Sequence, residues 1–148
     1  MTLIKNNRIQ TDTWRYRSAD EELAKSRNIV SLEYWLEHKS RLVTNNQELG
    51  LLVSGDTHID DFSDALEHIS LIAINIPVFT DGRGYSLAKR LRQQYNFKHE
   101  IRAVGDVLPD QALYLTRVGF DSMELANEKK AELALSKLSD YSVFYQTA

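Results

Sequence analysis

The sequence contains no cysteine among its 148 residues. This absence excludes a disulfide framework, a zinc site built from thiolates and an iron–sulfur cluster held by the chain's own thiolates. It also excludes a cysteine nucleophile. Any electron transfer in which the chain takes part therefore depends on a borrowed cofactor or on a partner protein.

Long apolar runs and an excess of positive charge are also absent. No apolar run approaches the roughly 18 residues that indicate a membrane-spanning helix, and residues 1–7 lack the apolar core of a secretory signal. The formal net charge of −3 argues against wholesale binding to nucleic acid or to an anionic membrane. We therefore expect a cytoplasmic protein with one α/β domain over residues 1–148.

The charge is unevenly distributed along the chain. Residues 81–117 contain seven basic and four acidic side chains, a net charge of +3 inside a protein whose remainder carries −6. The basic residues are Arg83, Lys89, Arg90, Arg92, Lys98, Arg102 and Arg117. Such a region suits a small or local anion better than a long polyanion, although scattered solvated faces would give the same count.

Alternation of apolar runs and amphipathic segments predicts a β-α fold over residues 28–148. Strands are expected at residues 49–54, 71–79, 100–104 and 121–125, with helices at about 32–42, from 60 or 61, at 85–95, 109–118 and 128–138. This spacing favours a parallel sheet, either half-barrel-like or a small open sheet. A half-barrel would favour pairing with another chain, so a homo-oligomer is a candidate assembly. Residues 1–27 are expected to form an N-terminal appendage with a short hairpin.

In parallel α/β folds, ligands bind beyond the carboxyl ends of the strands. Asp56, Asp81 and Asp106 each follow a different predicted strand, at one rim. Asp81 or Asp106 is therefore the candidate catalytic acid or base of a cofactor-independent enzyme, with Arg83 stabilising an oxyanion. The same aspartates would suit Mg²⁺, but helix capping explains them more simply, and we predict no metal site.

One segment after the second long predicted strand has the chemistry of an anion-binding turn. Its residues are Asp81, Gly82, Arg83, Gly84, Tyr85 and Ser86. The glycines permit a tight turn at a helix start, Arg83 offers a forked positive charge, and the last two residues add hydroxyls. The dinucleotide motif does not fit, because its third glycine would fall at Leu87, and no P-loop motif is present. A simple turn capped by Asp81 is the alternative.

A second cluster lies near the next strand end. Arg102 is expected inside a strand, with Asp106, Asp110, Gln111 and Tyr114 following it. Arg102 and Arg83 could form a two-arginine anion clamp oriented by an aspartate. The alternative is a structural network in which a buried Arg102 pairs with Asp106, Asp81 or Asp110.

Three stretches, residues 76–92, 100–111 and 114–121, resemble an uncharacterised bacterial family of short cytoplasmic proteins of unknown function. Genes of that family typically lie beside those of assimilatory sulfite reductase, and its members carry the label of a probable oxidoreductase in sulfite reduction. The resemblance implies that the family's motif includes residues 81–86, Arg102, Gly105, Asp106, Asp110 and Gln111. Family members often have arginine at the position of Pro109 and cysteine at that of Val118, so neither an essential charge nor thiol chemistry is assigned there.

The resemblance implies a pathway rather than a mechanism. We expect an accessory protein of sulfite or sulfate assimilation that binds a small oxyanion, an anionic cofactor or a partner at the strand-end rim. Two alternatives stay open, namely the acid/base enzyme described above and a purely structural partner of sulfite reductase. The sequence identifies no cofactor.

Overall fold

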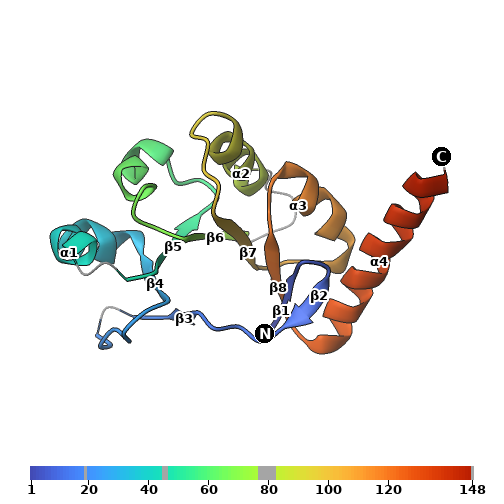
Figure 1. Cartoon of the computed structure of the whole chain (residues 1–148), viewed down its shortest axis with the longest axis horizontal. Coiled ribbons are helices and arrows are strands. Elements are labelled where there is room, and N and C mark those ends of the chain that lie inside the picture. Colours follow the sequence, from blue (N-terminus) through green and yellow to red (C-terminus); the bar gives the residue numbers. More distant parts are fainter. Residues whose placement is uncertain (19, 45–46, 77–82, 148) are drawn as a thin grey trace.

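A computed structural model describes residues 1–18, 20–44, 47–76 and 83–147 of the protein, and these contain eight strands in one sheet (Figure 1). The strands are β1 (Thr2–Lys5), β2 (Arg8–Gln10), β3 (Arg15–Tyr16), β4 (Asn28–Ser31), β5 (Leu49–Ser54), β6 (Leu71–Ile76), β7 (Glu100–Gly105) and β8 (Ser122–Leu125). Their order across the sheet is β2-β1-β8-β7-β6-β5-β4-β3. Every neighbouring pair from β3 to β8 is parallel, whereas β1 is antiparallel to both β8 and β2.

The helices lie along the convex side of the sheet and at one end of it (Figure 1). They are α1 (Leu32–Thr44), α2 (Arg83–Gln93), α3 (Ala112–Val118) and α4 (Glu128–Thr147), together with 3₁₀ turns η1 (Ile59–Asp61), η2 (Ser63–Ala65) and η3 (Pro109–Gln111). Within the described ranges, no helix has both the length and the apolar character that crossing a membrane requires.

The sheet is curled into a half-barrel. In sheet order β3 is separated from β8 by four strands, yet the Tyr16 hydroxyl on β3 lies 2.5 Å from the Glu124 carboxylate on β8. A flat sheet would place these strands far beyond side-chain reach, because neighbouring strands are about 4.8 Å apart. Of the two architectures that the sequence allows, the half-barrel is therefore the one found.

Alternation along each strand separates two faces with different chemistry. Ile72 and Ile74 of β6 and Ile101 of β7 point to the convex side, where they join the main apolar core beneath the helices. Leu71 and Ala73 point to the concave side, in a smaller apolar group. Burial on both faces explains why the strands are continuous apolar runs rather than alternating ones.

A segment of the N-terminal region, residues 11–17, crosses the open side of the half-barrel and is called the strap (Figure 1). Trp14 packs against the concave apolar group, and a Cβ atom at Gly50 would lie 3.2 Å from its ring. Asp12 and Tyr16 reach β7 and β8 by polar contacts. The strap thus covers part of the concave face from within the same chain.

Several expected boundaries differ from the structure. The predicted hairpin is present, but β1 and β2 extend the sheet, which is therefore mixed rather than parallel. Residues 28–31 form a strand that the sequence did not reveal, because four residues immediately before a helix are too short to show a period. The helix expected from residue 60 is two 3₁₀ turns, and the last helix continues to Thr147 rather than ending near 138.

Candidate functional site: a groove between two helices

The residues predicted at the strand-end rim do not share one environment. Asp81 and Gly82 lie outside the described residues, and of Arg83 only the backbone, which opens α2, is described. Gly84 is buried against β6, and a Cβ atom there would lie 3.3 Å from Ile76 Cγ1. This glycine therefore allows α2 to approach the sheet closely.

The residues after β7 are mostly engaged in local structure. Asp106 is exposed and its backbone N–H donates to the Ile76 carbonyl at 2.8 Å. Gln111 accepts a hydrogen bond from the backbone N–H of Leu108 at 3.0 Å and so caps the turn that precedes α3. Asp110 forms an exposed ion pair with Lys137 on α4 at 2.9 Å. Asp106 is thus the one predicted acid or base among the described residues that lies open at the rim.

Arg102 is buried on the concave face, in a group called the concave cluster. Its members are Lys5, Asp12, Tyr16, Glu100, Arg102, Ser122 and Glu124. The Arg102 guanidinium donates to Glu100 at 3.0 Å and to Asp12 at 2.9 Å, and it lies 3.5 Å from Glu124. Its side chain is only 1% exposed. An arginine in this setting is one member of a buried ion-pair network.

The electrostatics of the concave cluster favour the charged forms of Glu100 and Arg102 and the neutral form of Tyr16. Burial raises the pKa of Glu100, but hydrogen bonds from Lys5 and Ser122 and the charge of Arg102 outweigh it, so that this pKa lies below its ordinary value. Burial and the hydrogen bond to Glu124 raise the pKa of the Tyr16 phenol far above its ordinary value. Tyr16 therefore stays protonated and donates its hydrogen bond.

Arg102 is buried and paired, as the structural alternative expected, but its partners in the structure differ from Asp106 and Asp110, and the third expected partner, Asp81, lies outside the described residues. The partners are not Asp106 and Asp110 but Asp12 from the strap and glutamates on β7 and β8. The reason is the two-residue period of strands: Glu100 shares a face with Arg102, and Ser122 shares one with Glu124. Arg102 also lies toward the amino end of β7, whereas α2 begins beyond the carboxyl end of β6. The side chain of Arg83, the other member of the expected clamp, lies outside the described part of the structure.

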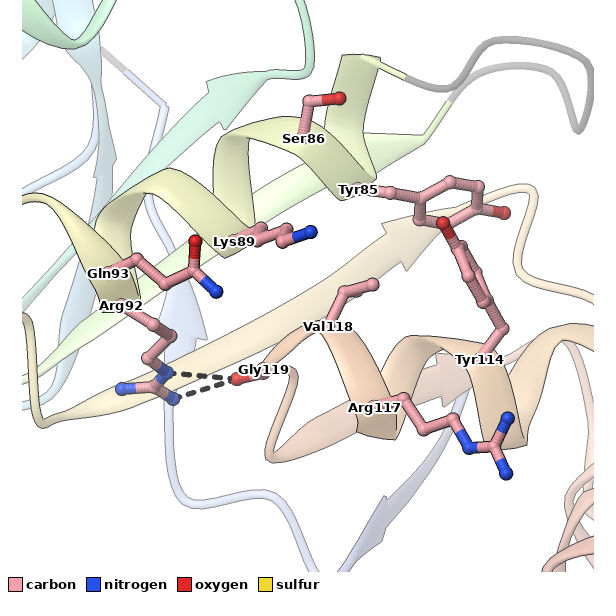
Figure 2. Close-up of a pocket in the computed structure, with 9 residues that line it drawn as sticks. All are labelled: Tyr85, Ser86, Lys89, Arg92, Gln93, Tyr114, Arg117, Val118 and Gly119. Carbon is pink, nitrogen blue, oxygen red and sulfur yellow. Dashed lines mark hydrogen bonds between the residues drawn. The ribbon is translucent and has the colours of Figure 1, made fainter.

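A groove of about 580 Å³ lies on the outer surface between α2 and α3 (Figure 2). Its lining residues are Tyr85, Ser86, Lys89, Arg92, Gln93, Tyr114, Arg117, Val118 and Gly119. Three of these are basic, and among the described residues that line the groove none is acidic. The α2–α3 groove therefore has the charge that the basic segment of the sequence predicted for an anion site.

The aromatic end of the α2–α3 groove is formed by Tyr85 and Tyr114. Their ring centroids are 5.0 Å apart and the rings are perpendicular, as Figure 2 shows. Burial, together with the neighbouring Tyr114, raises the pKa of the Tyr85 phenol above its ordinary value. The Tyr85 hydroxyl is consequently a protonated hydrogen-bond donor at neutral pH.

The three basic residues of the groove differ in the contacts that they make. The Arg92 guanidinium donates to the backbone carbonyls of Phe97, His99 and Gly119 and pairs with Asp121, which ties α2 to the start of β8. Lys89 is exposed and has no ion-pair partner within the described part of the chain. In Figure 2 its ammonium extends along the groove toward the tyrosines. Lys89 is therefore the cation best placed to meet a ligand.

The residues that line the groove overlap only in part with those predicted to bind a ligand. Tyr85 and Ser86 were predicted to bind a ligand and do line the groove. Lys89, Tyr114 and Arg117 were not singled out as ligand-binding residues. The available signal was helical spacing, since residues three or four apart share one helix face. Lys89 follows Tyr85 by four residues, and Arg117 follows Tyr114 by three.

Comparison with known proteins identifies a family. No curated protein matches the chain. The family model described as "Bacterial protein of unknown function (DUF934)" matches residues 50–148, which include most of β5, all of β6 to β8 and both walls of the α2–α3 groove. Because this match covers more than half of the chain, the protein belongs to the bacterial family of unknown function DUF934.

Proposed function

We propose that the protein is an accessory factor of sulfite or sulfate assimilation that binds an anion in the α2–α3 groove. The pathway follows from the resemblance of residues 76–92, 100–111 and 114–121 to a family encoded beside assimilatory sulfite reductase. The observation that carries the binding site is the imbalance of charge in the groove, where basic side chains occur without acidic ones among the described lining residues.

The groups at the groove supply complementary contacts for an anion. Lys89 provides a compact positive charge, and Arg117 provides a planar fork that matches the oxygens of sulfate, sulfite, phosphate or a carboxylate. Tyr85 and Ser86 lie in the first turn of α2, where the helix dipole also favours negative charge. The Tyr85 hydroxyl stays protonated and can donate to a ligand oxygen.

The role proposed for the chain is to bind and present the anion. Reduction of sulfite requires electrons, and a chain without cysteine has no thiol pair of its own to supply them. The electrons would come from a borrowed cofactor or from sulfite reductase as the partner.

Isothermal titration calorimetry with sulfite, sulfate and inorganic phosphate at fixed ionic strength tests the proposal. The wild type, Lys89→Ala and Arg90→Ala are compared. Arg90 is a matched control because it is the next residue on the same helix, has the same charge and is exposed, but does not line the groove. We expect Lys89→Ala to weaken binding by about tenfold or more, the scale of a charged hydrogen bond, and Arg90→Ala to bind within about twofold of wild type.

Equal anion binding by Lys89→Ala and Arg90→Ala would show that the groove is not the binding site. The pathway is tested separately by growth on sulfate of a strain that lacks the protein. Wild type and Arg90→Ala should restore growth, and a Lys89→Ala, Arg117→Ala double variant should not. Full restoration by the double variant would contradict the proposal.

A further inference from the structure

The α2–α3 groove presents aromatic rings as well as positive charge, and the rings are placed for contact with a ligand. Tyr114 is 52% exposed although it forms part of the groove wall. Its perpendicular contact with Tyr85 at 5.0 Å fixes the orientation of the pair. A perpendicular contact does not use both faces of both rings, so an exposed aromatic surface remains at this end of the groove.

Rings and cations follow one another in the same order on both walls. Lys89 comes four residues after Tyr85 on α2, and Arg117 comes three residues after Tyr114 on α3. On a helix these intervals are about 6 Å and 4.5 Å along the axis. Figure 2 shows the two rings at one end of the groove and Lys89 extending between them and Gln93. The groove thus has an aromatic end, and the charge of Lys89 lies beside that end along α2.

The size of the groove exceeds what a single oxyanion needs. Its volume of about 580 Å³ is within the range of roughly 300–1,000 Å³ that small-molecule sites occupy. A water molecule takes about 30 Å³ in the liquid, and an anion with four oxygens remains far smaller than the groove. A ligand that fills this space extends well beyond its charged group.

We infer that the ligand is a phosphate or sulfate ester that carries an aromatic ring and has about the size of a nucleoside monophosphate, with its ring against Tyr114 and its anionic group against Lys89. This inference rests on the proposed anion binding and assigns the ligand class. Tyr114 is the residue that selects for the ring. Stacking of a base on an aromatic side chain contributes about 1–3 kcal/mol, which corresponds to an affinity difference of about 5- to 150-fold.

Three probes separate the parts of such a ligand: AMP has the ring and the anion, inorganic phosphate has the anion alone, and adenosine has the ring alone. Calorimetry is performed with wild type, Tyr114→Ala, Tyr114→Phe and Lys89→Ala, each first shown by melting temperature to be folded.

We expect wild type to bind AMP more tightly than phosphate or adenosine. Tyr114→Ala should weaken AMP binding by about 5- to 150-fold and leave phosphate binding unchanged, whereas Tyr114→Phe, which keeps the ring, should bind AMP as wild type does. Lys89→Ala should weaken binding of AMP and phosphate but not of adenosine.

The possible results distinguish this inference from the function it rests on. AMP binding no tighter than phosphate binding, or AMP binding unchanged in Tyr114→Ala, overturns the ring contact while anion binding stands. Failure of sulfite, sulfate and phosphate as well as AMP to bind overturns the proposed function. Loss of AMP binding in Tyr114→Phe as well as in Tyr114→Ala overturns the ring contact in favour of a hydroxyl contact.

Discussion

The concave cluster and the α2–α3 groove both gather basic side chains, but they differ in what surrounds the charge. In the concave cluster, Arg102 is 1% exposed and has carboxylates from three different segments of the chain around it. In the groove, Lys89 is exposed, with no ion-pair partner in the described part of the chain. The first arrangement neutralises its own charges and holds strands together, whereas the second leaves charge available to a ligand. Environment rather than residue type thus separates a buried structural cation from an exposed one that a ligand could reach.

The largest expected effect comes from breaking the concave cluster at its centre. Arg102→Met leaves Glu124 without its cation and Glu100 with Lys5 alone, and both carboxylates are nearly buried. Removing one partner of a buried ion pair costs about 3–5 kcal/mol. The free energy of unfolding in urea should fall by this amount, while Arg90→Met, at an exposed position, should change it by less than about 0.5 kcal/mol. Equal effects of the two substitutions would contradict a structural role for Arg102.

How much of the concave cluster and of the groove could be predicted from the sequence depends on how far apart along the chain the interacting residues are. The β-α spacing located β5 to β8 because it is a local pattern. The strap could not be inferred, because Asp12 contacts a residue 90 positions away and Tyr16 one 108 positions away. No local pattern encodes such pairings. Part of the groove could be predicted, since the sequence indicated the basic segment and Tyr85. Which face of α2 opposes α3 could not, because packing on the curled sheet determines it.

A second prediction concerns the pH dependence of the concave cluster. The pKa of Glu100 is below its ordinary value of 4.5 in the folded protein. A carboxylate with a lowered pKa contributes stability above its unfolded pKa, and this contribution is lost as the pH falls through the folded pKa. Urea unfolding of wild type should therefore show stability that declines below about pH 4.5.

Glu100→Gln isolates this contribution. The variant should be less stable than wild type by about 2–3 kcal/mol at pH 7, and the difference should shrink as the pH falls. A gap of constant size from pH 7 to pH 3 would show that the charge of Glu100 is not what stabilises the cluster. Glu48→Gln is a suitable control, because its carboxylate is half exposed in an ion pair with Arg27 and should change the pH profile little.

A smaller effect on stability is expected at Gly119, where α3 ends and one end of the groove is formed. Gly119 ends α3 with φ of 118°, and a Cβ atom there would lie 2.8 Å from Cγ of Arg92. Gly119→Ala should therefore strain the backbone and displace the Arg92 side chain that binds the Gly119 carbonyl, at a cost of about 1–3 kcal/mol. Thermal unfolding measures this loss. An unchanged melting temperature would mean that the end of the groove tolerates rearrangement.

The smallest effect on stability is expected at Lys89. This substitution tests most directly whether the groove differs from the concave cluster. Lys89→Ala removes an exposed charge from a helix, so its free energy of unfolding should stay within about 0.5 kcal/mol of wild type. In saturating anion the two proteins should differ, because a ligand at a hundred times its dissociation constant stabilises the folded state by about 2.7 kcal/mol. Thermal shifts measured at one fixed ionic strength, in chloride alone and in chloride with the anion, would separate specific binding from screening, because screening acts on both proteins alike. If Lys89→Ala lost stability without any ligand, Lys89 would belong with Arg102 as a structural cation, and the distinction between the two regions would fail.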